Sequence, residues 1–132
     1  MRILIAYGSK GKFFHMQQFS NALKELGVEC MLVQDSKYST GFPSKKISEL
    51  IPNNKFKNLI NEFKPDGIFV DKQSHFALDA IKEKIPLFVL LRGHYWSELE
   101  WAKKTIHSNF KDKIILWFKN RTAEKCFEQA SA

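Results

Sequence analysis

A strand pattern, a glycine-bearing turn, a helix pattern and a second strand pattern follow one another within the first forty residues. The segment 2–7 (RILIAY) is almost uninterrupted apolar sequence, which is typical of a strand covered on both faces in a parallel sheet. Gly8 and Gly11 then interrupt it, and apolar residues recur at three- and four-residue steps over 13–26. The segment 28–33 (VECMLV) predicts a second strand. Parallel strands joined by one helix form a right-handed crossover, so this opening favours an α/β fold.

The rest of the chain repeats this alternation, after a long polar connection over 34–52. The further predicted elements are a helix from Asn53 to about Lys64, a strand over 68–70, a helix capped by Ser74, a strand over 87–91, a helix beginning at Ser97, and a final helix over 111–129. Ser97 and Glu100 have the spacing of a capping box, and Leu99, Ala102, Ile106 and Phe110 would form its apolar stripe. A strand over 113–118 is the competing interpretation of the last segment.

This order predicts a three-layer Rossmann-like domain over 1–132, with helices on both faces of a parallel sheet of about four strands and with C-terminal helices. We expect the strand order 3-2-1-4, which would place the ends of the first and fourth strands side by side. Ligands of such sheets bind at the carboxyl ends of the strands.

Net charge narrows the range of partners. The chain carries +7 with a pI near 9.4, which favours phosphorylated substrates, nucleic acid or an anionic membrane surface. The lysines are spread over nearly every segment, so an ordinary solvated surface is an equally good explanation. Two cysteines without metal spacing indicate reduced thiols. No window approaches the ~18 apolar residues of a spanning helix, and we expect a cytoplasmic protein, with contact at the inner face of the membrane as an option.

The first candidate site is the turn formed by Gly8, Ser9, Lys10 and Gly11. A glycine turn that opens a helix presents backbone N–H groups and the positive end of the helix dipole to an anion or a hydroxyl. The pattern is G-x-x-G, and it matches neither the dinucleotide-binding fingerprint nor a P-loop. A tight connection without a ligand explains it as well.

The second candidate is the corner after the fourth strand. His94 could accept a proton or bind a hydroxyl, Gly93 allows close backbone approach, and Arg92 could pair with phosphate. The alternatives are a surface histidine and an arginine paired with a nearby glutamate. Asp71, at the end of the third strand, could hold a hydroxyl or a metal, although a carboxylate near a helix N-terminus is the commoner explanation.

Other motifs are weaker. His15, His75 and His107 lack ligand spacing, and we interpret them as structural or solvent-facing; no metal site is predicted. The aromatic and basic run over 110–119 could lie on a membrane interface, but packing on the core with the lysines extending outward is the favoured interpretation.

The opening MRILI with its glycine turn, Lys64-Pro65-Asp66 and the segment 90–98 (LLRGHYWSE) together resemble the N-terminal domain of GT-B glycosyltransferases, closest to the retaining group-1 family. The resemblance implies transfer of a sugar from a nucleotide-sugar to a glycan, lipid-linked or small-molecule acceptor, without a bound cofactor or metal. It also implies that Gly8, Gly11 and His94 border the acceptor side of the cleft.

Such enzymes carry a second, donor-binding domain with an E-x7-E motif. The sequence contains no such half and no E-x7-E pattern. The resemblance therefore implies an acceptor-side domain that is inactive alone and works with a C-terminal domain or a separate donor-binding chain. A non-catalytic flavodoxin-like binding module is the alternative, and no motif supports nucleic-acid binding.

Overall fold

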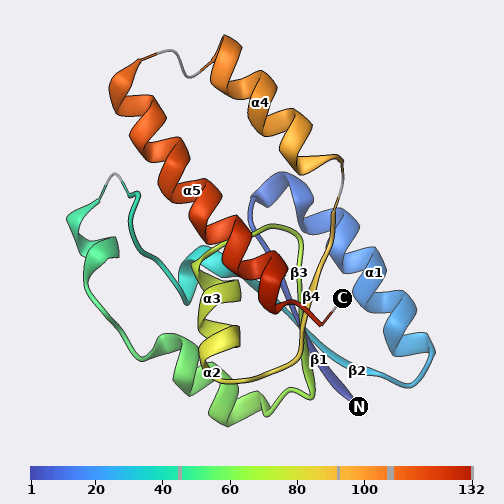
Figure 1. Ribbon diagram of the computed structural model, residues 1–132. Coiled ribbons are helices and arrows are strands. Elements are labelled where there is room, and N and C mark those ends of the chain that lie inside the picture. The colour runs from blue at the N-terminus through green and yellow to red at the C-terminus, as the bar shows by residue number, and fades with distance from the viewer. Residues whose placement is uncertain (45, 92, 107–108, 132) are drawn as a thin grey trace.

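Four parallel strands form one sheet in the computed structural model, which describes all residues except 45, 92, 107, 108 and 132 (Figure 1). The strands are β1 (Arg2–Tyr7), β2 (Glu29–Gln34), β3 (Gly67–Val70) and β4 (Leu87–Val89). The helices are α1 (Phe13–Glu25), α2 (Lys55–Phe63), α3 (His75–Lys82), α4 (Tyr95–Thr105) and α5 (Phe110–Gln129), with short 3-10 turns at Lys10–Lys12, Asp35–Lys37 and Ile47–Leu50. The predicted fold class is confirmed, and so is the helical interpretation of the final segment.

The predicted strand order is wrong. The sheet has the order β2-β1-β3-β4, because β3 pairs with β1 (Ile3 opposite Gly67) and not with β2. The long connection after β2 carries the chain back past β1, and right-handed crossovers in opposite directions place α1 on one face of the sheet and α2 on the other. The end of β3 therefore lies between the ends of β1 and β4. This is the flavodoxin-like order, in which the switch point lies between β1 and β3.

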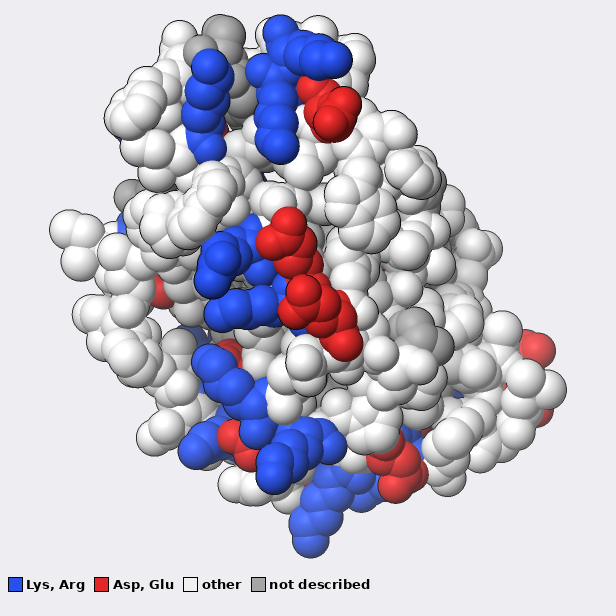
Figure 2. All heavy atoms as spheres, in the orientation of Figure 1, with Lys and Arg blue, Asp and Glu red and all other residues white. Residues whose placement is uncertain are grey.

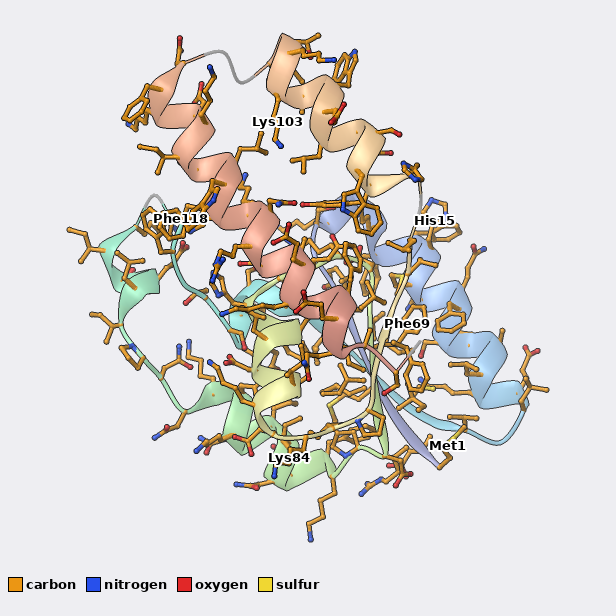
Figure 3. The ribbon with its side chains drawn as sticks, in the orientation of Figure 1. Met1, His15, Phe69, Lys84, Lys103 and Phe118 are labelled. Atoms are coloured by element: carbon orange, nitrogen blue, oxygen red, sulfur yellow. The ribbon has the colours of Figure 1, made fainter. Side chains whose placement is uncertain are left out.

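The main core lies on the face covered by α2, α3 and α5 (Figure 1). Phe76 of α3 is fully buried there, and its ring meets that of Phe56 edge-on at 4.9 Å. Cys126 of α5 closes the same cluster, which also contains Leu4, Ala6, Ile68, Val70 and Leu87 from the strands. On the opposite face, Phe19 of α1 stacks on Phe69 of β3 with 4.6 Å between ring centres (Figure 3). The predicted helices thus cover both faces of the sheet.

Two details of α4 differ from the expectation. The helix begins at Tyr95 with His94 as its N-cap, so the predicted Ser97–Glu100 capping box is wrong. Leu99 is buried, but Ile106 is exposed and Phe110 belongs to α5, so the predicted stripe ends at Ala102. The base of α4 is anchored to α5 by a hydrogen bond from the Tyr95 hydroxyl to Asn120 Oδ1 (3.1 Å). Among the described residues, none of the helices is both long enough and apolar enough to span a bilayer.

Candidate functional site

Asp71 ties the end of β3 to the glycine turn after β1. Its buried Oδ1 accepts the Gly8 N–H at 2.9 Å, and its Oδ2 lies 3.5 Å from Lys12 Nζ at the start of α1. A carboxylate between a turn amide and a lysine holds the ends of the neighbouring strands β1 and β3 together at the switch point. The geometry therefore assigns Asp71 an anchoring contact, and no cluster of three or more metal-ligating side chains occurs in the part of the chain that the structure describes.

The glycine turn is partly covered by protein. A Cβ on Gly8 would overlap the far end of the Lys72 side chain, so a larger residue there would require that side chain to move. Ser9, Lys10 and Gly11 are exposed where the 3-10 turn leads into α1. A Cβ on Gly11 would meet no atom, so close packing does not require glycine there.

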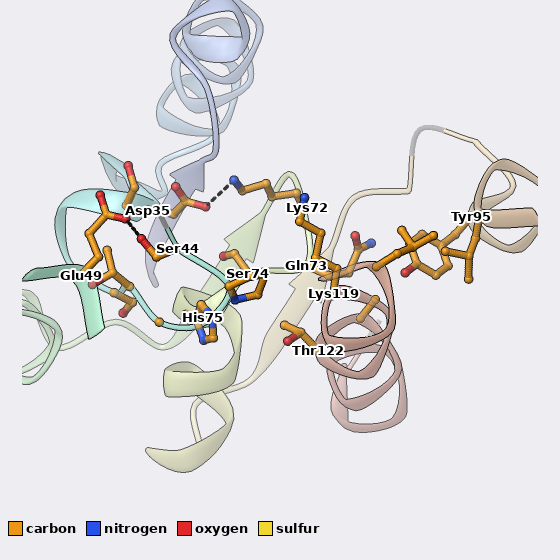
Figure 4. A pocket seen from close by; sticks show the side chains of 18 of the residues that line it. Asp35, Ser44, Glu49, Lys72, Gln73, Ser74, His75, Tyr95, Lys119 and Thr122 are labelled. Carbon is orange, nitrogen blue, oxygen red and sulfur yellow. Dashed lines mark hydrogen bonds and ion pairs between the residues drawn. The ribbon is translucent and has the colours of Figure 1, made fainter. Parts of the chain in front are cut away.

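A cavity of about 500 Å³ lies at the same end of the sheet, on the α3 side (Figure 4). Its walls come from the loop after β2, the end of β3, the start of α3 and the inner sides of α4 and α5. The lining residues that carry polar groups are Asp35, Ser36, Ser39, Thr40, Ser44, Glu49, Lys72, Gln73, Ser74, His75, Tyr95, Glu98, Lys119 and Thr122. Leu99, Ala102, Leu116 and Ala123 add apolar surface to the lining, and the volume is suited to a small molecule.

Several residues that line this cavity carry buried side-chain oxygens without a hydrogen-bond partner. Asp35 is only 4% exposed; its Oδ2 lies 3.4 Å from Lys72 Nζ, while the described residues supply no hydrogen-bond partner to its Oδ1. The hydroxyl oxygens of Ser39 and Ser74 are likewise buried and unpartnered. Buried polar groups in native proteins are nearly always hydrogen-bonded, so three such oxygens on residues that line one cavity indicate a binding site for donor groups.

His75 and Tyr95 line opposite walls of the cavity (Figure 4). The Nε2 of His75 donates to the Phe42 carbonyl at 2.9 Å, which leaves Nδ1 as an acceptor. The His75 ring also occupies the space that a Cβ on Gly41 would need. Burial, with a smaller contribution from Glu124, raises the pKa of the Tyr95 hydroxyl, so this group stays a proton donor at neutral pH.

His94 lies at the exposed corner after β4. Its Nδ1 caps α4, accepting the Ser97 N–H at 3.3 Å and lying 2.7 Å from Ser97 Oγ. Since Nδ1 is an acceptor, the neutral ring carries its proton on Nε2. Gly93 lines a smaller hollow of about 130 Å³, which shares Gln73, Tyr95 and Glu98 with the main cavity. Arg92 lies outside the described residues.

The glycine turn and the His94 corner are therefore on one edge of one parallel sheet, but they are not adjacent. The end of β3 separates them, which contradicts the predicted neighbourhood of the first and fourth strands. None of Gly8, Ser9, Lys10, Gly11, Asp71 or His94 lines the main cavity.

Sequence reasoning missed the residues that do line it. Asp35 follows β2 directly and Lys72 stands two residues after β3. Both positions lie at carboxyl ends of strands, where ligand-binding residues are expected, so the sequence did contain a signal for them. His75 was interpreted as structural, and it does bond a backbone carbonyl, but it also faces the cavity. Lys119 and Thr122 lie on a long helix and have no local signal.

Comparison with protein families, curated proteins and solved structures gave no match. The glycosyltransferase resemblance accordingly stays a prediction, and the function is argued from the site itself.

Proposed function

We propose that this chain is the acceptor-side domain of a glycosyltransferase, and that the cavity beside α5 holds a hydroxyl-rich acceptor. The observation that carries the proposal is the set of three buried, unpartnered oxygens on Asp35, Ser39 and Ser74. A sugar offers several hydroxyl donors at short spacing, and each can pair with one of these oxygens. The family resemblance and the carboxyl-edge position of the cavity support the same assignment.

The charges around the cavity suit an acceptor that also carries a phosphate. Lys72 is already close to Asp35, and Lys119 adds a second ammonium group from α5. The donor nucleotide-sugar would be bound mainly by a second domain or a separate chain, and this domain alone would not turn over. No cofactor or metal is part of the proposal.

His94 is assigned an orienting role and not that of a general base. With Nδ1 engaged in capping α4, the neutral ring offers an Nε2–H donor, whereas a base would need a free lone pair on Nε2. The ring can thus donate to a hydroxyl or a phosphate of a ligand at the exposed corner after β4.

Because His94 Nδ1 is used to cap α4, a second candidate function is a module that binds its ligand without catalysis. Addition of a donor-binding domain separates the two: sugar transfer that depends on both chains supports the transferase, and ligand binding without any transfer supports the module.

Ligand-observed NMR with monosaccharides, their phosphates and nucleotide-sugars tests the binding step. We expect a hydroxyl-rich ligand to bind, and Asp35→Asn, which turns one oxygen into a donor, to weaken binding about tenfold. Asp79→Asn is the matched control, because Asp79 pairs with Lys82 outside the cavity. Equal binding by wild type and Asp35→Asn would contradict the site, and efficient transfer by this chain alone would contradict the need for a second domain.

A further inference from the structure

The outer face of α5 carries large apolar side chains that the described residues leave exposed. Phe110, Ile114 and Trp117 recur at steps of four and three residues, so they form one stripe along the first half of the helix. Phe110 is 80% exposed and Trp117 56%. The core contacts of α5 come instead from Leu116, Ala123 and Cys126, on the opposite side. The favoured interpretation, that the aromatic run packs on the core, is therefore wrong for this stripe.

A second segment extends the same surface. Phe118 of α5 meets Phe42 edge-on with 4.7 Å between ring centres, and it also meets the neighbouring Trp117 ring at 4.9 Å. Figure 3 shows Phe118 on the side of α5 that faces the loop after β2. Together, Phe42, Phe110, Ile114, Trp117 and Phe118 form what we term the α5 outer face. Contiguous exposed apolar surface of this kind marks an interaction site.

Basic residues accompany these side chains. Lys111 and Lys113 are exposed on the two flanks of the stripe, and the guanidinium carbon of Arg121 lies 5.5 Å from the centre of the Trp117 ring. Asp112, between the two lysines, is half-buried. In Figure 2 the end of the molecule formed by α4 and α5 is mostly uncharged surface, on which basic side chains outnumber acidic ones.

The composition decides between two kinds of occupant. Protein interfaces are enriched in aromatic residues and arginine but depleted in lysine, whereas helices that lie in a membrane surface combine these residues with lysine. The two exposed lysines that flank the stripe therefore favour a membrane. Tryptophan and a neighbouring arginine both suit the headgroup region, where an apolar ring meets water and phosphate. The net charge of +7 adds a long-range attraction to anionic lipid.

We infer that the α5 outer face docks the protein on an anionic lipid bilayer, with Phe110, Ile114 and Trp117 at the level of the headgroups and Lys111, Lys113 and Arg121 pairing with lipid phosphates. The contact is peripheral and lies in the membrane surface. It is independent of the ligand in the cavity, because the stripe and the cavity lining occupy different sides of α5.

Vesicle flotation of the purified chain tests this inference. Wild type should float with phosphatidylcholine vesicles that contain about a quarter phosphatidylglycerol, should float far less with phosphatidylcholine alone, and should be released by salt. Lys111→Glu with Lys113→Glu should lower partitioning by more than about 25-fold, because loss of each positive charge alone costs about fivefold and each glutamate adds repulsion. Phe110→Ser with Trp117→Ser should lower it about tenfold.

Matched controls come from α1 and α2. Phe14→Ser removes an aromatic side chain that is 61% exposed, and Lys55→Glu reverses an exposed lysine, so both should leave partitioning unchanged. Far-UV circular dichroism checks that every variant is folded. The inference is overturned if wild type does not float with anionic vesicles or if the control variants lose as much binding as the stripe variants. It is also overturned if the stripe variants abolish a dimer seen by sedimentation while vesicles bind neither form, since a second copy would then cover this face.

Discussion

Replacing Asp71 tests whether its carboxylate stabilises the fold or binds a ligand. In Asp71→Ala the Gly8 N–H loses its acceptor at the end of β1, and Lys12 loses its ion-pair partner. A hydrogen bond to a charged group contributes about 1.5–3 kcal/mol. The ion pair adds only a few tenths, because Lys12 is about one-third exposed and its Nζ lies 3.5 Å away. The expected loss in free energy of unfolding is therefore about 2–3 kcal/mol.

Asp71→Asn is the companion variant. The amide oxygen can still accept the Gly8 N–H, so only the charge is lost, and the expected loss falls to about 1 kcal/mol. Urea unfolding followed by far-UV circular dichroism measures both values, with an unchanged dependence on urea as the sign that only the folded state was altered.

Titration of each variant with the cavity ligand compares the effect of replacing Asp71 with that of replacing Asp35. Both Asp71 variants should retain affinity while they remain folded, whereas Asp35→Asn should lose affinity with little change in stability. The reasoning is refuted if Asp71→Ala unfolds within about 0.5 kcal/mol of wild type, or if Asp71→Asn loses the ligand and Asp35→Asn keeps it.

Two further predictions concern a buried thiol and a helix cap. Burial raises the pKa of Cys126 to about 11, so above pH 9 the unfolded chain loses this proton first; stability should fall by up to about 3 kcal/mol between pH 9 and 11. In Cys126→Ala the free energy of unfolding should not fall in this way. Urea unfolding of both proteins between pH 8 and 11 measures the difference, and the same dependence on pH in both would refute the prediction. His94→Ala removes the cap of α4 and should lower stability by about 1 kcal/mol. His94→Asn keeps an acceptor and should restore most of it; equal losses in thermal unfolding would show that capping is not what His94 contributes.

Local patterns determined the elements of this fold well. Mainly apolar runs predicted the four strands, and Gly27, at φ +82°, lies just beyond the end of α1. Such features depend on neighbours within a few residues, which the sequence displays directly.

Strand order and site composition depend on long-range placement. Whether β3 pairs with β1 or β2 is decided by how the connection over 34–52 crosses the sheet, and no local pattern records that path. The site prediction followed the assumed order: it combined the ends of the first and fourth strands, whereas the cavity uses Asp35 after β2 and Lys72 after β3. The start of α4 was misplaced because a histidine supplied the cap where a serine was expected.

One helix connects both proposals. The inner side of α5 places Leu116 and Lys119 on the cavity wall, and its outer side exposes Ile114 and Trp117. A helix that closes a polar cavity and also lies in a membrane surface would bring that cavity close to lipid headgroups, which suits a lipid-linked acceptor. Because the two sides share no residue, substitutions on the outer stripe should spare binding of a water-soluble sugar and reduce only the use of an acceptor embedded in vesicles. A loss of both would mean that α5 acts as a single structural support, and the lipid-linked acceptor would lose its rationale.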